Sequence, residues 1–391
     1  MNICKARSFP LVWLLALVLL SGCAALTTSS SSGDTLAIAE QGYFHVGGTY
    51  HTIDKSEVLV GQMYVWYQIP KQLRRPYPVV LVHGGGQTGT NFLRTPDGRP
   101  GWADFFLQEG YTVYVIDWPG HGKSNYVAPV YGPPGLVPTE ARERRFTAPK
   151  EFTDNWPQAQ KHTQWPGSGR KGDPIFDHFL ASQSITPTEI VKGAGPLNEK
   201  LTADALIVLL DKIGPAIILT HSMSGKPGWL VADARPKLVK GMLAVEPNGP
   251  PFHEAPYAWG SSPGEKLTRP WGLTAFPVAY DPPVKSSAEI KIVQDEKADG
   301  PGVVRCYRQS EPARRLVNLQ QVPTLILQSE ASYHAGYDHC TVRFLKQAGV
   351  NVDFIKLEDV GILGNGHMMM LEKNNQEIAK VMTDWLQKSV K

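Results

Sequence analysis

The sequence has few cysteines, little net charge and no apolar run long enough to cross a bilayer. Only 4 of its 391 residues are cysteine, and none has C-x-x-C spacing, so neither a structural zinc site nor another metal is expected. Lysine and arginine number 39 against 36 aspartates and glutamates, a balance too close to indicate nucleic acid as a partner. A content of 42% hydrophobic and 19% charged residues excludes wholesale disorder and a coiled coil.

Glycine and proline are abundant instead. The chain holds 37 glycines and 32 prolines, against average usages of roughly 7% and 5%. They follow no G-X-Y period, so they predict many turns and long ordered loops rather than a fibre. The length suits one large α/β domain or two small ones.

The first residues are typical of an export signal. Lys5 and Arg7 precede an uncharged apolar run over residues 11–20, which is shorter than the roughly 20 residues of a spanning helix. The run ends at Leu20-Ser-Gly-Cys23, which resembles the lipobox of bacterial lipoproteins, where the signal is cut before the cysteine and the thiol is acylated.

Three segments follow from this interpretation. We expect residues 1–22 to be a lipoprotein signal peptide, Cys23 to carry lipid, and residues 23–41 to form a Ser- and Thr-rich tether before a domain over residues 42–391. The chain would then be exported and anchored to membrane lipid, facing the periplasm or the cell exterior. The alternative is a plain secretory signal in which Cys23 is incidental.

Two cysteines remain in the domain, Cys306 and Cys340. In an oxidising compartment they are candidates for a disulfide. The alternative is a pair of unpaired buried thiols.

The domain begins with a pattern of antiparallel strands and continues with buried ones. Residues 43–46 and 50–53 flank a Gly47-Gly48 pair that predicts a turn, and Val65, Tyr67 and Ile69 alternate after them. Short apolar runs of the parallel-sheet kind then occupy residues 79–82, 112–116, 216–219, 241–245, 324–327 and 354–357. Helical spacing lies between them, over 201–213 and around 378–385. The pattern predicts an α/β fold with a mostly parallel sheet and an N-terminal antiparallel meander.

Two long segments interrupt this alternation, residues 126–198 and 247–321. Both are rich in proline and aromatic residues and far exceed the two to six residues of an ordinary βα connection. We expect the first, and more loosely the second, to be a lid insertion that shapes a substrate pocket, the alternative being a stabilising excursion elsewhere. Candidate pocket residues are Gly86, Trp156, Trp165 and Trp271.

A buried strand runs directly into Thr220-His-Ser222-Met-Ser224-Gly and then a helix. This layout is typical of a nucleophile elbow, in which a tight strand–helix turn presents a serine hydroxyl. The usual pattern is G-x-S-x-G, and here Thr220 and Ser224 stand at the small positions around Ser222. If Ser224 were the nucleophile, Lys226 would have to fit the crowded turn, so Ser222 is favoured. The alternative role for such a serine is a helix N-cap.

Other groups that acyl transfer needs are also present. His83-Gly-Gly-Gly86 follows a strand where an oxyanion loop is expected. His367, in a glycine-containing loop before the last helix, is the natural general base by chain order. For the acid that orients it, Glu246, Glu330 and Asp338 remain open, each just after a strand.

These motifs identify the chain as similar to an α/β-hydrolase. More closely, it resembles a bacterial secreted esterase family with an S-H-S-x-S-G elbow, a V-E-P acid segment and a G-N-x-H-M-M-M histidine loop. Here these read Thr220-His-Ser-Met-Ser-Gly225, Val245-Glu-Pro247 and Gly364-Asn-Gly-His-Met-Met-Met370. The resemblance implies a triad of Ser222, Glu246 and His367.

The same resemblance implies the reaction. Hydrolysis of a carboxylic ester would pass through an acyl-enzyme at Ser222, with the backbone N–H groups of Gly85 and Met223 as oxyanion hole and with no cofactor. The family's best-known member has two adjacent cysteines where this chain has Gly85-Gly86, and the insertion after Glu246 is longer here. The near-neutral charge and the aromatic insertions suggest a small uncharged ester with an apolar part as substrate.

Other functions compete with an esterase. A lactonase or amidase would use the same chemistry, whereas epoxide and haloalkane hydrolases normally place aspartate at the elbow. A non-catalytic, lipid-anchored binding protein is a further alternative, although such relatives usually lose a triad member. His334, Asp338 and His339 could surround a metal ion, but a loop with scattered polar residues is favoured.

Overall fold

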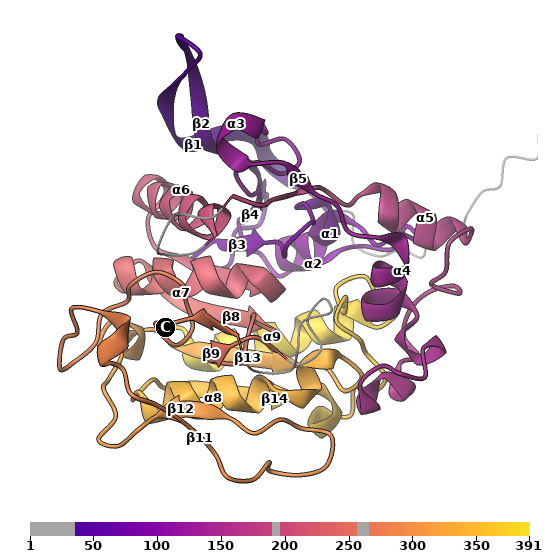
Figure 1. Ribbon diagram of the computed structural model, residues 1–391. Coiled ribbons are helices and arrows are strands. Elements are labelled where there is room, and N and C mark those ends of the chain that lie inside the picture. Colours follow the sequence, from indigo (N-terminus) through magenta and orange to yellow (C-terminus); the bar gives the residue numbers. More distant parts are fainter. Residues whose placement is uncertain (1–35, 190–195, 256–265) are drawn as a thin grey trace, which may run out of the picture. The chain divides into compact units, whose positions relative to one another are not determined.

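The computed structural model describes residues 36–189, 196–255 and 266–391 (Figure 1). Its centre is an eight-stranded sheet in the order β1-β2-β4-β3-β7-β8-β13-β14. Strands β1 and β2 pair antiparallel, as do β2 and β4, and the remaining neighbours are parallel. The predicted mostly parallel sheet with an antiparallel N-terminal part is therefore confirmed. The strands are β1 Ile38–Ile53, β2 Ser56–Pro70, β3 Val79–Val82, β4 Val113–Asp117, β7 Ala216–His221, β8 Val239–Val245, β13 Thr324–Gln328 and β14 Val352–Lys356.

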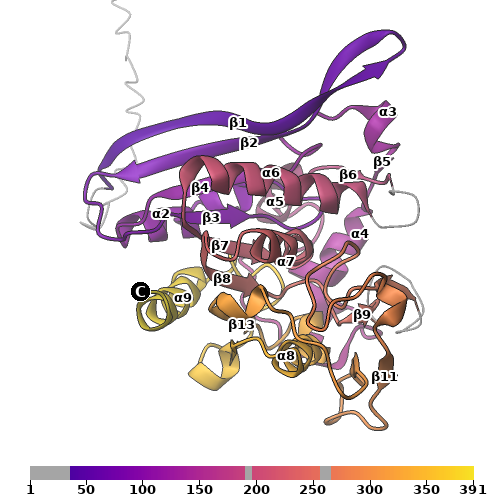
Figure 2. The same cartoon turned by 90° about the vertical axis from the view of Figure 1, so that its left-hand side faces the viewer.

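The N-terminal strands differ from the expectation in two ways. Gly47 and Gly48 do not form a turn: β1 continues through them, and the chain reverses at Asp54 and Lys55 to give one long hairpin (Figure 2). Gly47 has φ +68°, and a Cβ on it would lie 3.3 Å from the Cβ of Ala205. Close packing on a helix therefore explains the glycine here. In addition, β1 begins at Ile38, so the last residues of the expected tether are strand.

Both faces of the sheet are covered by helices (Figures 1 and 2). Val80 and Val82 of β3 join the core cluster of α6 (Leu197–Ile213) and α7 (Gly225–Ala234). Val79 and Leu81 of the same strand join the cluster of α2 (Trp102–Gln108) and α9 (Asn375–Ser389). A strand buried on both faces must be apolar throughout, which is why these runs do not alternate.

The first insertion consists of short elements. They are α3 Ala128–Tyr131, β5 Pro134–Gly135, α4 Thr139–Arg142, the π-turn η1 Glu143–Thr147, the 3-10 turns η2 Pro149–Glu151 and η3 Pro157–Lys161, α5 Pro174–Ala181 and β6 Thr186–Pro187. Residues 190–195 of this segment lie outside the described residues. The insertion contacts the loops that follow β3, β13 and β14, so it lies at the carboxyl end of the parallel strands.

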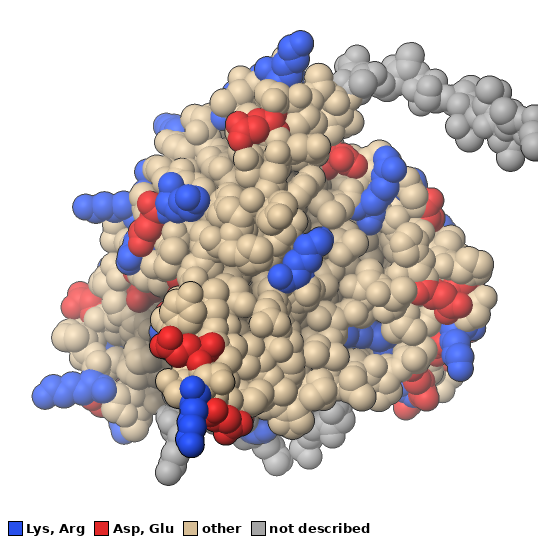
Figure 3. Space-filling view, turned by 90° about the horizontal axis from the view of Figure 1, so that it is seen from above, with Lys and Arg blue, Asp and Glu red and all other residues tan. Residues whose placement is uncertain are grey.

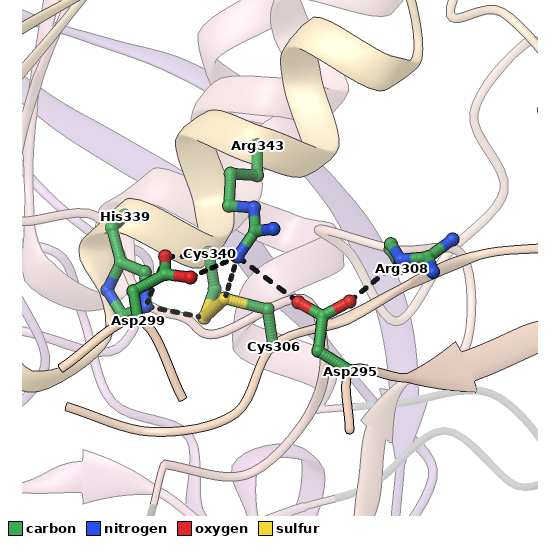
Figure 4. Close-up of a disulfide and its surroundings, with 7 residues drawn as sticks. All are labelled: Asp295, Asp299, Cys306, Arg308, His339, Cys340 and Arg343. Atoms are coloured by element: carbon green, nitrogen blue, oxygen red, sulfur yellow. Dashed lines mark hydrogen bonds and ion pairs between the residues drawn. A yellow bond between two sulfur atoms is a disulfide. The ribbon is translucent and has the colours of Figure 1, made fainter. Parts of the chain in front are cut away.

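The second insertion contains the short pairs β9 Phe252–His253 with β10 Leu267–Arg269, and β11 Ile292–Gln294 with β12 Tyr307–Gln309. Its residues 256–265 lie outside the described residues. The structure joins Cys306 to Cys340 of α8 (Asp338–Gln347) by a disulfide, with a Cα–Cα distance of 5.1 Å (Figure 4). Arg343 lies beside the bridge and pairs with Asp295 and Asp299. The insertion is thus tied to the helix that follows β13.

The export predictions concern a part of the chain that is not described. Residues 1–22, Cys23 and the tether up to residue 35 lie outside the described residues. Among the helices that the structure describes, none combines the length and apolar character that crossing a membrane requires. On the face of the described residues in Figure 3, basic and acidic side chains lie scattered among one another, without a broad patch of one sign.

Candidate active site

Ser222 stands at a strained strand–helix turn. Strand β7 ends at His221, a 3-10 turn spans Ser222–Ser224 (η4), and α7 follows at once. Ser222 has φ +58°, a left-handed conformation that a non-glycine residue rarely adopts. The turn is possible because its neighbours are small: a Cβ on Gly225 would lie 2.7 Å from the Cβ of Pro247. This is the geometry of a nucleophile elbow.

Ser224, the alternative nucleophile, is engaged in holding the elbow together. Its hydroxyl accepts a hydrogen bond from the backbone N–H of His221 at 2.7 Å and lies 2.8 Å from the Val82 carbonyl, to which it can donate. Ser224 is also completely buried. These contacts give Ser224 a structural role and favour Ser222 as the reactive hydroxyl.

The glycine loop after β3 lies directly against the elbow. A Cβ on Gly84 would lie 3.0 Å from the Cβ of Ser222, and a Cβ on Gly85 would collide with the Met223 sulfur. His83 fixes the start of this loop: Nδ1 lies 2.8 Å from the Gly84 carbonyl, and Nε2 accepts the Trp118 N–H at 3.0 Å. Burial lowers the pKa of His83 to about 4, so the ring is neutral and can accept at Nε2.

His367 and Glu246 form a buried pair. Nδ1 of His367 lies 2.6 Å from Oε2 of Glu246, and both side chains are fully buried. Glu246 follows the end of β8 and has φ +43°. Burial raises the pKa of Glu246, while hydrogen bonds to its carboxylate act in the opposite direction. Oε1 accepts the Ser329 N–H and hydroxyl at 2.8 and 2.6 Å, and Oε2 accepts the Ser332 hydroxyl at 2.7 Å.

The two other acid candidates have different partners. Glu330 pairs with Lys161 at 2.8 Å and accepts the Gly364 N–H at 3.0 Å. Asp338 lies 2.9 Å from Nδ1 of His334. Of the three acids, the structure therefore brings Glu246 to His367.

The loop that carries His367 is held by Glu372. This buried carboxylate accepts the Gly366 N–H at 2.9 Å and the Asn365 side-chain amide at 2.7 Å, and it lies 2.6 Å from Nε2 of His162 in the first insertion. A backbone N–H, a side-chain amide and an imidazole from two segments thus converge on one acid. Nε2 of His367 is buried and has no hydrogen-bond partner among the described residues.

Tyr333 is a site residue that the sequence analysis missed. It begins the turn η7 (Tyr333–Gly336) after β13, its ring lies 4.8 Å from that of His367, and its hydroxyl interacts with the Ser222 side chain. Burial raises the pKa of Tyr333 to about 12, so it stays protonated. In the sequence, Tyr333 follows a predicted strand closely, and this position could have marked it as a candidate. Only acidic residues were considered there.

Other rings surround His367. The His334 ring stacks on it at 4.7 Å and 8°, and Nε2 of His221 lies 2.9 Å from the His367 carbonyl oxygen. Burial lowers the pKa of His334 to about 3, which favours its neutral form. The three residues considered as an alternative metal site have different partners. His334 pairs with Asp338, whereas His339 lies by Cys340 and Asp299 (Figure 4).

The four candidate pocket residues fall into two groups. Gly86 contacts the first insertion, because its carbonyl accepts a hydrogen bond from Arg142. The rings of Trp156 and Tyr333 form an edge-to-face contact with centroids 5.6 Å apart. Trp165 instead packs on Phe179 of α5 at 5.4 Å. Trp271 packs against the cluster on the other face of the sheet. Contact with a residue beside Ser222 is thus seen for Gly86 and Trp156, and the pocket role of Trp165 and Trp271 stays a prediction.

The pH profile should report on His367. Burial, His334 and Arg145 all hold the pKa of His367 well below 6.5. A general base must be neutral, so lowering its pKa extends activity toward acid. We expect kcat/KM for an ester to remain high at pH 6.5 and to fall only at lower pH. An acid limb centred above pH 6.5 would contradict this environment for the histidine.

The Tyr333 contact can be tested by Tyr333→Phe, which removes the hydroxyl and keeps the ring. Losing the interaction between this hydroxyl and the Ser222 side chain is expected to lower kcat about 2- to 10-fold. The ring packing is retained, so the melting temperature should change little. Tyr337→Phe, at the end of the same turn, is a matched control because this buried tyrosine packs its ring on those of Tyr333 and His334, and no hydrogen bond of the described residues joins its hydroxyl to Ser222. Equal losses in both variants would argue against a role for the Tyr333 hydroxyl.

Comparison with known proteins agrees with this geometry. The model of the alpha/beta hydrolase family matches residues 79–381, which span every parallel strand of the sheet. The protein therefore belongs to the alpha/beta hydrolase family.

One relative agrees with this membership, and one solved structure shares the fold. The chain is 44% identical over 349 residues to a protein of Fungal sp. (strain ATCC 74256) described as probable secreted lipase phiG, with 88% of this chain and 89% of the relative covered. The solved structure of a novel bacterial esterase has a TM-score of 0.60 at 24% identity and covers 91% of this chain and 98% of its own. The second likeness shows the shared fold.

Proposed function

We propose that the protein is a serine hydrolase that cleaves a carboxylic ester through an acyl-enzyme at Ser222. The observation that carries the proposal is the buried His367–Glu246 pair, 2.6 Å between Nδ1 and Oε2. The His367 ring lies 4.5 Å from the ring of His221, which directly precedes the elbow serine with φ +58°. A base oriented by a carboxylate and a serine on a strained turn are the parts that nucleophilic acyl transfer requires.

In this mechanism the Ser222 oxygen attacks the ester carbonyl while Nε2 of His367 takes the hydroxyl proton. Glu246 accepts from Nδ1, keeps the ring in the tautomer whose Nε2 is a base, and stabilises the imidazolium that forms. The tetrahedral oxyanion would be held by the backbone N–H groups of Gly85 and Met223. His367 then gives its proton to the departing alcohol, and a water, activated in the same way, releases the acid.

Family membership and the 44% identical relative described as a probable secreted lipase both support a carboxylic ester hydrolase as the class of enzyme. The same relative supports export of this protein. The lipid anchor at Cys23 rests on the resemblance of Leu20-Ser-Gly-Cys23 to a lipobox and remains part of the proposal.

A panel of substrates tests the proposal. The purified protein should hydrolyse aryl and alkyl esters of short acids, with smaller or no rates on matched lactones and amides, and chelators should not change these rates. Faster turnover of a lactone or an amide would support the alternative enzyme of the same fold. Hydrolysis of none of the three classes would support the binding protein instead.

A further inference from the structure

Two arginines of the first insertion are buried beside the proposed active site. Arg142 is the last residue of α4 and Arg145 lies three positions later in the π-turn, so both occur on one turn of helix. Arg142 is 2% exposed and Arg145 is 7% exposed. Arginine is almost never buried to this extent unless an anion or a set of hydrogen bonds compensates its charge.

Arg142 reaches the oxyanion loop. Its Nη2 donates to the Gly86 carbonyl at 3.0 Å, and a Cβ on Gly86 would lie 2.6 Å from this nitrogen. The third glycine of the His83–Gly86 motif therefore allows the guanidinium to lie against the loop. The guanidinium also lies over the Phe146 ring at 5.4 Å, and Phe146 in turn stacks on His367 at 5.4 Å.

The charge of Arg142 is not matched by a carboxylate. No ion pair joins it to an acid within the described ranges, and its buried Nη1 has no hydrogen-bond partner there. The two buried acids of the site are engaged elsewhere, Glu246 with His367 and Asp338 with His334. Burial and the neighbouring Arg145 lower the pKa of Arg142 only to about 10, so it is a cation at neutral pH.

Arg145 adds a second positive charge at the same place. Its guanidinium lies over the Tyr333 ring at 4.4 Å, on the side chain that contacts Ser222. A neutral ester would leave the charge of Arg142 without an anion once the insertion covers it. A carboxylate would supply two acceptors in the plane that a guanidinium fork matches.

From this arrangement we infer that the substrate carries a free carboxylate, which Arg142 binds with help from the charge of Arg145. The inference rests on the proposed function, because the anion site is defined by its position beside Ser222 and the oxyanion loop. The substrate class becomes an ester with a second, ionised carboxyl group, in either the acyl or the alcohol part. The alternative is that Arg142 only supports the Gly86 carbonyl.

Matched esters test the inference with the full chain. For the acyl side, mono-para-nitrophenyl adipate is compared with para-nitrophenyl hexanoate, which replaces the carboxylate by a methyl group. For the alcohol side, para-butyryloxybenzoate is compared with para-butyryloxybenzamide. After subtraction of spontaneous hydrolysis, kcat/KM is expected to be at least about 10-fold higher for the anionic member of one pair, the size of a charge-assisted contact.

Variants show whether Arg142 causes the preference. Arg142→Gln is expected to bring the anionic-to-neutral ratio of kcat/KM close to one. Arg144→Gln is the matched control, because Arg144 lies in the same turn but pairs with the exposed Asp154 at 2.6 Å, and it should keep the wild-type ratio. Equal loss on both members in Arg142→Gln would show a purely structural arginine and overturn the inference.

The wild-type ratio is informative even if Arg142→Gln does not fold. Hydrolysis of the neutral esters without preference for the anionic member of either pair overturns the inference and leaves the proposed function standing. Absence of hydrolysis for all four esters would instead count against the proposed function.

Discussion

Ser222→Ala should abolish ester hydrolysis, lowering kcat by roughly 10⁵-fold. The substitution removes the one atom that would form the acyl-enzyme and leaves the oxyanion loop and the His367–Glu246 pair in place. The measurement is kcat for a para-nitrophenyl ester at saturating substrate. Such a loss is too large for a changed hydrogen bond and identifies the nucleophile.

The fold of this variant must be intact for the result to count. The backbone carbonyl of Ser222 accepts a hydrogen bond from the Asn248 N–H at 2.8 Å, and alanine keeps that bond. The circular dichroism spectrum and the melting temperature should therefore match those of the parent. A Ser222→Ala protein with full activity would remove the serine assignment, and Ser224 would then have to be examined.

The second large effect is expected from Glu246→Gln, which should lower kcat about 10³- to 10⁴-fold. Four donors converge on this carboxylate, from His367, the N–H and hydroxyl of Ser329, and the hydroxyl of Ser332. In glutamine, an NH₂ group replaces one of the two carboxylate oxygens. On that side the NH₂ group, itself a donor, would face the donors that the oxygen accepted from. If that side is His367, the ring changes tautomer and Nε2 ceases to be a base.

Glu330→Gln is the matched control. Glu330 also follows β13, but it lies in an ion pair with Lys161, whose side chain is 56% exposed, and such pairs contribute little. Its substitution should leave kcat nearly unchanged. The melting temperatures of both variants are measured as well, to detect any loss of stability. The reverse pattern, a small effect at Glu246 and a large one at Glu330, would move the orienting acid one strand along the sheet.

The sequence was sufficient for the sheet and the elbow because their signals are local. A strand buried on both faces must be apolar at every position, as residues 79–82 are, and a strand that runs into Ser222 without a loop can only make a sharp turn. Glycines at 84–86, 364 and 366 mark where backbone must approach other groups. Each of these features can be recognised within about ten residues.

Other features depend on contacts between distant segments. Gly47 and Gly48 resemble a turn locally, but packing on Ala205 keeps them within a strand. Tyr333 reaches the Ser222 side chain only because the loops after β7 and β13 meet at one edge of the sheet.

Net charge and the first insertion give different expectations about the substrate. A balance of 39 basic and 36 acidic residues suggests an uncharged ester, whereas the inferred carboxylate rests on buried Arg142 beside the oxyanion loop and buried Arg145 over the Tyr333 ring. Whole-chain charge is dominated by exposed residues, as the mixed signs in Figure 3 illustrate. The charge that a substrate meets is set by a few buried side chains, and their positions depend on the fold.

The most direct test of the central claim is covalent labelling with a fluorophosphonate, followed by peptide mapping by mass spectrometry. Such probes react with a serine that a neighbouring base activates. We expect one probe per chain, on Ser222, with loss of ester hydrolysis in proportion to labelling and no labelling of Ser222→Ala. Continued hydrolysis in a protein that the probe leaves unlabelled, or stoichiometric labelling at another serine, would contradict the account.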